Sequence, residues 1–222
     1  MSYKRQSLKN ASFCLLASLA AGAVFVVGAQ AAPAWKIGGA SLVGLELILS
    51  KSFLVQLGIP GVTTIHWSSA ETHKTLHSTS LGDGILELIK GLVKGAEGAC
   101  SVVEPATIKY KDKLVEHAGV VYDVYEPLEG TAFTNIKVTG AECPVKTPAG
   151  GEPLTGSFAS VVPSPEAVSQ PLKPVSSATQ KLLNEKLELK LGMFYGKQSA
   201  SLEGTALESL IGKNVGNVWG AN

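Results

Sequence analysis

The stretch of sequence that decides the fold runs from Gly119 to Val162 and reads GVVYDVYEPLEGTAFTNIKVTGAECPVKTPAGGEPLTGSFASVV. Apolar and polar residues alternate or cluster as in strands in three parts of it, residues 119–125, 131–138 and 154–162. Alternation with a period of two places every second side chain on the same face of a strand. Each part can therefore bury one face and expose the other to solvent. Breaks rich in proline and glycine separate the three parts. The stretch therefore predicts a meander of antiparallel strands.

Strand-like patterns continue on both sides of this stretch. Residues 62–67 are rich in β-branched and aromatic residues, and residues 187–193 have leucine or methionine at every second position, with Glu188 and Lys190 between them. The chain is therefore predicted to be all-β, an antiparallel sandwich or barrel of about ten strands. Separate strands are expected at 41–49, 52–57 and 72–78, and Lys111-Asp112-Lys113 is expected to be a turn.

One segment favours a helix over a strand. Five apolar residues between positions 85 and 93 recur at helical spacing, although several nearby glycines weaken a helix. They are Ile85, Leu88, Ile89, Leu92 and Val93. We therefore expect a short helix near residues 85–93.

Residues 1–31 have the layout of an export signal. Basic residues precede a charge-free apolar run from Phe13 to Val27, and Ala29-Gln30-Ala31 supplies the small residues that a signal peptidase needs. Cleavage is predicted before Ala32, which makes the protein secreted or located at the cell surface. The alternative is an uncleaved anchor, since the charge-free stretch is long enough to span a bilayer, and only then is membrane contact expected.

Residues 32–222 are predicted to be a single β-rich domain. A Pro/Ser-rich connection at residues 163–178 divides it into two sub-halves. The full chain has 19 basic and 18 acidic residues, and three of the basic ones lie in the predicted signal, which leaves the mature chain near −2. Its only arginine, Arg5, is also in the signal. Nucleic-acid binding is therefore not expected, because it depends on basic contacts to phosphate.

Two cysteines remain after the predicted cleavage, Cys100 and Cys143. In an exported chain an even number of cysteines favours a disulfide, and two separate buried thiols are the alternative. Two cysteines are too few for a structural zinc site, so no metal is expected. No cofactor-binding motif is found either, and no cofactor is expected.

The histidines and aromatic residues are the remaining candidates for a site. His73 and His77 would share a face of either a helix or a strand. In a helix the pair could bind one metal ion, but in the strand that the neighbouring threonines favour they would lie ~13 Å apart, too far to do so. A secreted hydrolase would have to use these two and His66 as scattered residues, and no catalytic residue is assigned. Five aromatic residues are candidates for a ligand-binding face, with half-buried core positions as the alternative. They are Trp35, Trp67, Trp219, Tyr122 and Tyr125.

Several short motifs carry a resemblance to known proteins. They are Trp35-Lys36-Ile37, Cys100-Ser101-Val102 with Cys143-Pro144-Val145, Leu154-x-Gly156, and the tail Gly216-Asn217-Val218-Trp219-Gly220. Together they resemble a broad set of uncharacterised exported bacterial β-rich proteins with a signal peptide and paired cysteines. The resemblance implies export and a β fold, and it implies no catalytic residue.

Three functions follow from these features as expectations. The first is an exported non-enzymatic β-protein with a cell-surface, structural or assembly role, whose unpaired strand edges bind another copy to form a homo-oligomer. The second is an extracytoplasmic module that binds a glycan or a lipid. The third is the secreted hydrolase.

Overall fold

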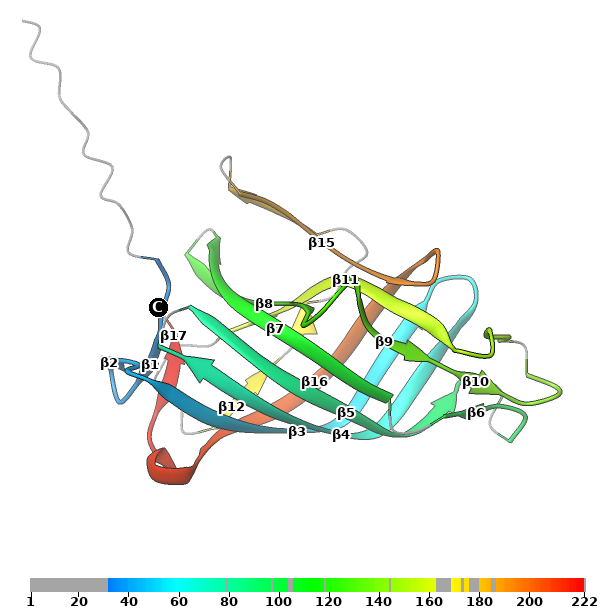
Figure 1. Ribbon diagram of the computed structural model, residues 1–222, viewed down its shortest axis with the longest axis horizontal. Coiled ribbons are helices and arrows are strands. Elements are labelled where there is room, and N and C mark those ends of the chain that lie inside the picture. The colour runs from blue at the N-terminus through cyan, green and yellow to red at the C-terminus, as the bar shows by residue number, and fades with distance from the viewer. Residues whose placement is uncertain are drawn as a thin grey trace, which may run out of the picture. The chain divides into compact units, whose positions relative to one another are not determined.

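Eight long strands form a closed antiparallel barrel in the computed structural model (Figure 1). The structure describes residues 32–78, 80–96, 98–103, 106–117, 119–143, 145–162, 169–172, 174–175, 180–184 and 187–221. In hydrogen-bonding order the barrel strands are β3 (Leu45–Ile59), β4 (Thr63–His77), β5 (Leu81–Val93), β7 (Ala106–His117), β8 (Val120–Pro127), β11 (Glu152–Val161), β15 (Leu187–Tyr195) and β16 (Gln198–Ile211). The ring closes because β16 pairs with β15 at residues 198–200 and with β3 at residues 201–211.

Shorter strands lie at the two ends of the barrel (Figure 1). At one end, β1 (Trp35–Ile37) pairs with β2 (Ala40–Ser41) and β17 (Trp219–Ala221). At the other end, β6 (Ser101–Val102) pairs with β10 (Val138–Thr139). The remaining elements are β9 (Ala132–Ile136), which pairs with β11, β14 (Gln180–Asn184), which pairs with β15, and the 3-10 turn η1 (Gly212–Asn214).

The Pro/Ser-rich connection contributes two short strands to the barrel wall. β12 (Ser169–Leu172) pairs with β16, and β13 (Pro174–Val175) pairs with β11. Both pairings lie beyond the part of β11 and β16 that β15 reaches. Strands from before and after the connection also pair with each other, since β3 binds β16 and β11 binds β15. The two predicted sub-halves therefore share one sheet.

The all-β prediction is confirmed, and between sandwich and barrel the structure is a barrel. The three runs of the deciding stretch become β8, β9 and β11, with β11 paired to both of the others. The strands expected at 41–49 and 52–57 merge into β3, apart from Ser41 in β2. The separate strands expected at 62–67 and 72–78 are instead one continuous strand, β4. Among the described residues, no helix has the length and apolar character needed to cross a membrane.

The expected helix at residues 85–93 is wrong, because these residues belong to β5. Their helical spacing arises because both faces of β5 carry apolar side chains. Leu88 and Val93 are buried inside, whereas Ile85 and Ile89 are more than a third exposed. Lys90 has a φ of 58°, and this irregularity shifts the inward face from even to odd positions.

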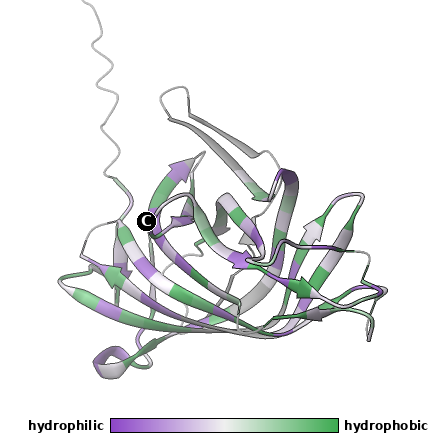
Figure 2. Cartoon of the chain, turned by 45° about the vertical axis from the view of Figure 1, so that its right-hand side comes forward, coloured by the Kyte–Doolittle hydropathy of each residue, from purple (hydrophilic) through white to green (hydrophobic). Residues whose placement is uncertain are grey.

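The barrel interior is filled by two apolar clusters. The larger contains Trp67, Ile108, Tyr125 and Phe158, and the smaller contains Trp35, Leu76, Leu114, Leu210 and Trp219. Apolar and polar segments alternate along the long strands (Figure 2). Alternation lets each strand direct one face to this interior, and closure leaves few free edges in the wall.

Candidate functional site

A layer of charged side chains separates the two apolar clusters. On β4, for example, Trp67 belongs to the larger cluster, Lys74 is buried, and Leu76 belongs to the smaller one. The same order of apolar, charged and apolar side chains recurs on β7, β8 and β16. The charged layer therefore consists of Lys74, Asp112, Asp123 and Glu208, all of them buried.

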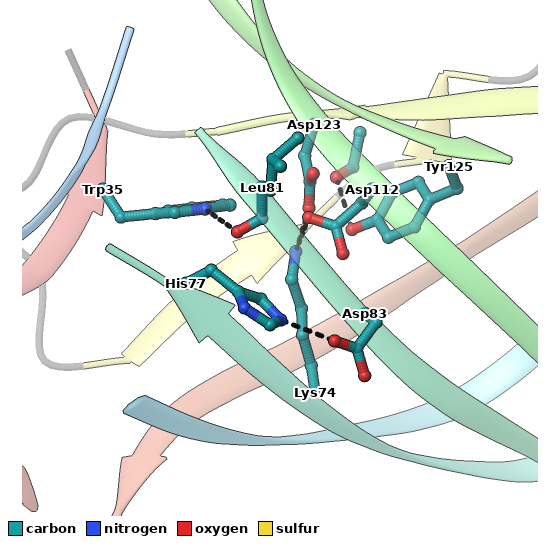
Figure 3. Close-up of polar contacts among 9 residues, drawn as sticks. Trp35, Lys74, His77, Leu81, Asp83, Asp112, Asp123 and Tyr125 are labelled. Carbon is teal, nitrogen blue, oxygen red and sulfur yellow. Dashed lines mark hydrogen bonds and ion pairs between the residues drawn. The ribbon is translucent and has the colours of Figure 1, made fainter. Parts of the chain in front are cut away.

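Lys74 is the centre of this layer. Its Nζ atom donates a hydrogen bond to Oδ2 of Asp123 and lies 3.0 Å from Oδ2 of Asp112 (Figure 3). The same atom lies 4.6 Å from the centre of the Trp35 ring and 5.2 Å from that of Tyr125. One ammonium group is thus held between two carboxyl groups and two aromatic rings, out of contact with solvent.

Strand alternation explains why these side chains meet. Asp112 follows Ile108 and Tyr110 on the inward face of β7, so the turn expected at Lys111-Asp112-Lys113 is wrong. Asp123 likewise shares its face of β8 with Tyr125. Each charged residue therefore takes a regular inward position of its strand.

Glycines of β5 leave the space that this contact needs. β5 lies between β4 and β7, and its Gly84 is opposite both Lys74 and Tyr110. A Cβ atom at Gly82 would lie 2.7 Å from the carboxylate oxygens of Asp112, and one at Gly84 would lie 2.5 Å from the Tyr110 hydroxyl. The absence of side chains at these two positions lets the side chains of Lys74 on β4 and Asp112 on β7 make contact over β5.

The mutual charges of the layer control its ionisation. Burial lowers the pKa of Lys74, but Asp112, Asp123 and Glu208 raise it by more, so the pKa lies above its ordinary value. Burial raises the pKa of Asp112 well above its ordinary value, and the neighbouring Asp123 adds to this despite the opposing effect of Lys74. Lys74 is therefore charged, and Asp112 holds a proton more tightly than an ordinary aspartate.

Glu208 on β16 is the third carboxyl group of the layer. Burial raises its pKa to about 7, with Lys74 lowering it and Asp123 raising it. Burial also raises the pKa values of Tyr110 and Tyr125, so both stay protonated at neutral pH. The Tyr125 hydroxyl is 3.1 Å from Oγ of Ser160. The layer thus combines three buried carboxyl groups with a single ammonium group.

The five predicted aromatic residues do not form a common exposed face. Trp35 and Trp219 lie in the smaller apolar cluster with their ring centres 6.3 Å apart, and Trp67 lies in the larger one. Tyr125 is buried against Phe158, with ring centres 4.6 Å apart. Tyr122 is partly buried and packs against Val124 and Ala159. Core packing explains these positions, while Tyr125 and Trp35 also contact Lys74.

The three histidines that a hydrolase would need do not converge. His73 and His77 occupy the outer face of β4, where His77 Nε2 is 2.5 Å from Oδ1 of Asp83, and His66 pairs with Gln56 and Leu92 nearer the other end of the strand. Among the described residues, no group of three or more His, Cys, Asp or Glu side chains is placed to hold a metal ion.

The predicted cysteine pair is found. The Sγ atoms of Cys100 and Cys143 are 2.00 Å apart, which is disulfide distance. The two residues flank the β6–β10 ribbon, in which Val102 is opposite Val138. Thr147 strengthens this end, since its hydroxyl accepts a hydrogen bond from the Val138 backbone N–H and donates one to the Val138 carbonyl.

The sequence pattern was not used to predict the charged layer, although the alternation around Asp123 indicates a buried charge. Asp123 stands two positions from Val121 and Tyr125 in an alternating run, which marks a carboxylate on the buried face. A charged residue is rarely buried without a partner, so such a position predicts an opposite charge elsewhere on an inward face. The partner, Lys74, is 49 residues away in the sequence.

Comparison with known protein families, curated proteins and solved structures gives no match for this chain. The resemblance to exported bacterial β-rich proteins therefore stays a prediction. The predicted signal at residues 1–31 lies outside the described residues.

Proposed function

We propose that the protein is an exported, non-enzymatic β-barrel with a structural or assembly role at the cell surface. The observation that supports this most is a set of large apolar side chains on the outer wall of a barrel whose interior is already filled. Leu45 and Leu47 on β3 are 60% and 49% exposed, and Leu207 on β16 is 47% exposed. Ile211, which is half-buried, lies opposite Leu47 in the sheet. We call these four residues the β3–β16 patch.

Exposed apolar patches on soluble proteins commonly mark interaction sites. Burying apolar surface contributes roughly 25 cal/mol per Å². The full chain carries a net charge of only +1, and the predicted mature chain is near −2, so two copies would repel each other weakly. A second copy of the chain is therefore the partner that the patch fits best. The closed wall makes face-to-face contact a better route than the strand edges.

Sedimentation velocity over a range of concentrations tests this assembly. We expect the wild-type chain to associate as its concentration rises, and Leu47→Glu to remain monomeric because it places a charge in the patch. Leu92→Glu is the matched control, since Leu92 has the same 49% exposure but lies on β5. A wild-type chain that stays monomeric throughout would contradict the proposal, as would equal effects of the two substitutions.

A second candidate is an extracytoplasmic module that binds a glycan or a lipid. It is supported by a groove of about 410 Å³ beside β5, β7 and β8, whose lining includes Leu81, Val124 and Leu128. Two polar pairs border it: His77 is hydrogen-bonded to Asp83, and Lys113 forms an ion pair with Glu126 at 3.0 Å between Nζ and Oε1. Apolar walls with a few polar groups are typical of ligand sites.

Binding measurements separate this candidate from assembly. A glycan array and co-sedimentation with phosphatidylcholine vesicles would detect the two ligand classes, and Leu128→Glu should abolish binding by charging the groove. Leu47→Glu should leave that binding intact. Absence of binding in both measurements would remove this candidate.

A further inference from the structure

The charged layer holds an amine and a carboxyl group in contact in a dry interior. Nζ of Lys74 donates its hydrogen bond to Asp123, and the side chains of Lys74, Asp112 and Asp123 have exposed fractions of 0%, 0% and 2%. Figure 3 shows the lysine reaching from β4 to the carboxyl groups of β7 and β8. Reactive groups held in this way have effective molarities far above those reached in solution.

The layer contains more carboxyl groups than an ion pair requires. Asp123 alone could balance Lys74, yet Asp112 lies 3.0 Å from the same nitrogen, and the charge of Glu208 on β16 also raises the pKa of Lys74. Buried carboxyls without enough positive charge retain protons. A protonated carboxyl can donate a hydrogen bond, so Asp112 is able to pass a proton to Asp123 or take one from Lys74.

We propose that Lys74 and Asp123 form an intramolecular isopeptide bond, an amide between Nζ of Lys74 and Cγ of Asp123, with Asp112 as the proton carrier. The bond would join β4 to β8 across β5 and β7. It is a covalent modification that is separate from the proposed assembly role, and it needs no cofactor or second substrate.

The reaction is a condensation in which one water molecule leaves. It begins with Lys74 as the ammonium, Asp123 as the carboxylate and Asp112 as the neutral acid. Asp112 gives its proton to Asp123 and then accepts one from the Lys74 ammonium, which leaves a free amine beside a neutral carboxyl. The amine lone pair attacks Cγ of Asp123 to form a tetrahedral intermediate.

The collapse of this intermediate releases water and completes the amide bond. Asp112 donates its proton to a hydroxyl on the former Asp123 carboxyl, the C–O bond breaks, and water departs. Asp112 then takes the excess proton from nitrogen and ends as the neutral acid it was at the start. One C–N bond has formed, one C–O bond has broken, and no group has been oxidised or reduced.

The surroundings favour this step over a permanent ion pair. Trp35 and Tyr125 flank the nitrogen and exclude water, which would otherwise hydrate the ammonium and the carboxylate. A low local dielectric reduces the advantage of the charged pair over the neutral amine and acid from which the amide forms. Gly82 and Gly84 leave room for the two carboxyl-bearing strands to approach Lys74.

Intact mass spectrometry of the purified, reduced and denatured full chain tests the proposal. We expect a mass lower by one water molecule than that of the sequence with its mapped N-terminus. After proteolysis, tandem spectra should identify a branched peptide that joins the segment containing Lys74 to the segment containing Asp123. Lys74→Met and Asp123→Ala should restore the full mass.

Two further variants separate the chemistry from folding. Asp112→Asn keeps the Lys74–Asp123 contact but cannot carry the proton, so it should fold and show the full mass. Glu126→Gln is the matched control, because Glu126 lies on the outer face of β8 and pairs with Lys113. It should still lose water. Far-UV circular dichroism confirms that each variant is folded.

A folded wild-type chain with the full sequence mass would overturn the proposal and leave a buried ion pair. A loss of water that maps to a linear peptide would also overturn it, since Asp83-Gly84 can lose water as a succinimide. Complete bonding in Asp112→Asn would overturn the role of Asp112.

Discussion

Glu208 is a buried carboxyl group of the charged layer, and its pKa lies near neutral pH. Its pKa is raised from 4.5 to about 7 because it is buried. The folded state therefore binds a proton that the unfolded state releases between these two values. The free energy of unfolding should consequently decrease as pH rises through this window.

Glu208→Gln should remove that decrease. The substitution keeps the shape of the side chain but cannot ionise, so relative to the wild type it should gain about 3 kcal/mol between pH 4.5 and pH 8. Urea denaturation at several pH values measures the difference. An offset between the two proteins that does not change with pH would show that Glu208 does not titrate in this range.

Gly84 matters at the residue scale because its neighbours leave no space for a side chain. A Cβ atom there would lie 2.5 Å from the Tyr110 hydroxyl and 2.7 Å from the His73 carbonyl oxygen. Gly84→Ala should therefore lower the free energy of unfolding by about 1–3 kcal/mol. Gly150→Ala is the control, since nothing lies within 4 Å of that position, and it should change stability by less than about 0.5 kcal/mol.

The elements at the two ends of the barrel are held by different means. β1 and β17 close one end through buried tryptophans, and Trp35 Nε1 donates a hydrogen bond to the Leu81 carbonyl. The β6–β10 ribbon at the other end has only two residues per strand. So short a ribbon is marginal by itself, and the link between Cys100 and Cys143 holds it in place.

Breaking that link should cost stability but leave the barrel fold. The two cysteines are 43 residues apart, so Cys143→Ser with Cys100→Ser should lower the free energy of unfolding by about 4 kcal/mol if chain entropy dominates. Thermal denaturation of the double variant and of the oxidised wild type checks the size of the loss. An unchanged Tm would show that the ribbon depends on packing instead.

At the scale of the whole molecule, the closed ring predicts cooperative unfolding. β16, late in the chain, pairs along most of its length with β3, near its beginning. The two apolar clusters also both contain side chains from β3, β4, β7 and β16. Neither half should therefore unfold before the other.

Tryptophan fluorescence can follow the two clusters separately. Trp67 lies in one cluster and Trp35 and Trp219 in the other, so Trp67→Phe leaves only the second cluster as a reporter. Its denaturation midpoint by fluorescence should equal the midpoint by far-UV circular dichroism. Separate midpoints would indicate two independent folding units.

Much of the secondary structure could be predicted from residue patterns, because local alternation decides it. The strands at 120–127, 132–136 and 152–161 follow the alternation of the deciding stretch. The prediction failed at residues 85–93, where apolar residues on both faces and an irregularity at Lys90 imitate helical spacing. It failed again at Asp112, because a polar tripeptide suits both a turn and a strand with a buried charge.

The chain's own residue pattern determined the β character and the pairing of its two cysteines, since these depend on near neighbours and on a count. Closure into a ring, and the contact of Lys74 with Asp112 and Asp123, were decided only by the tertiary structure. A period of two tells on which face a side chain lies, but the order of strands around the barrel determines which side chains it meets there.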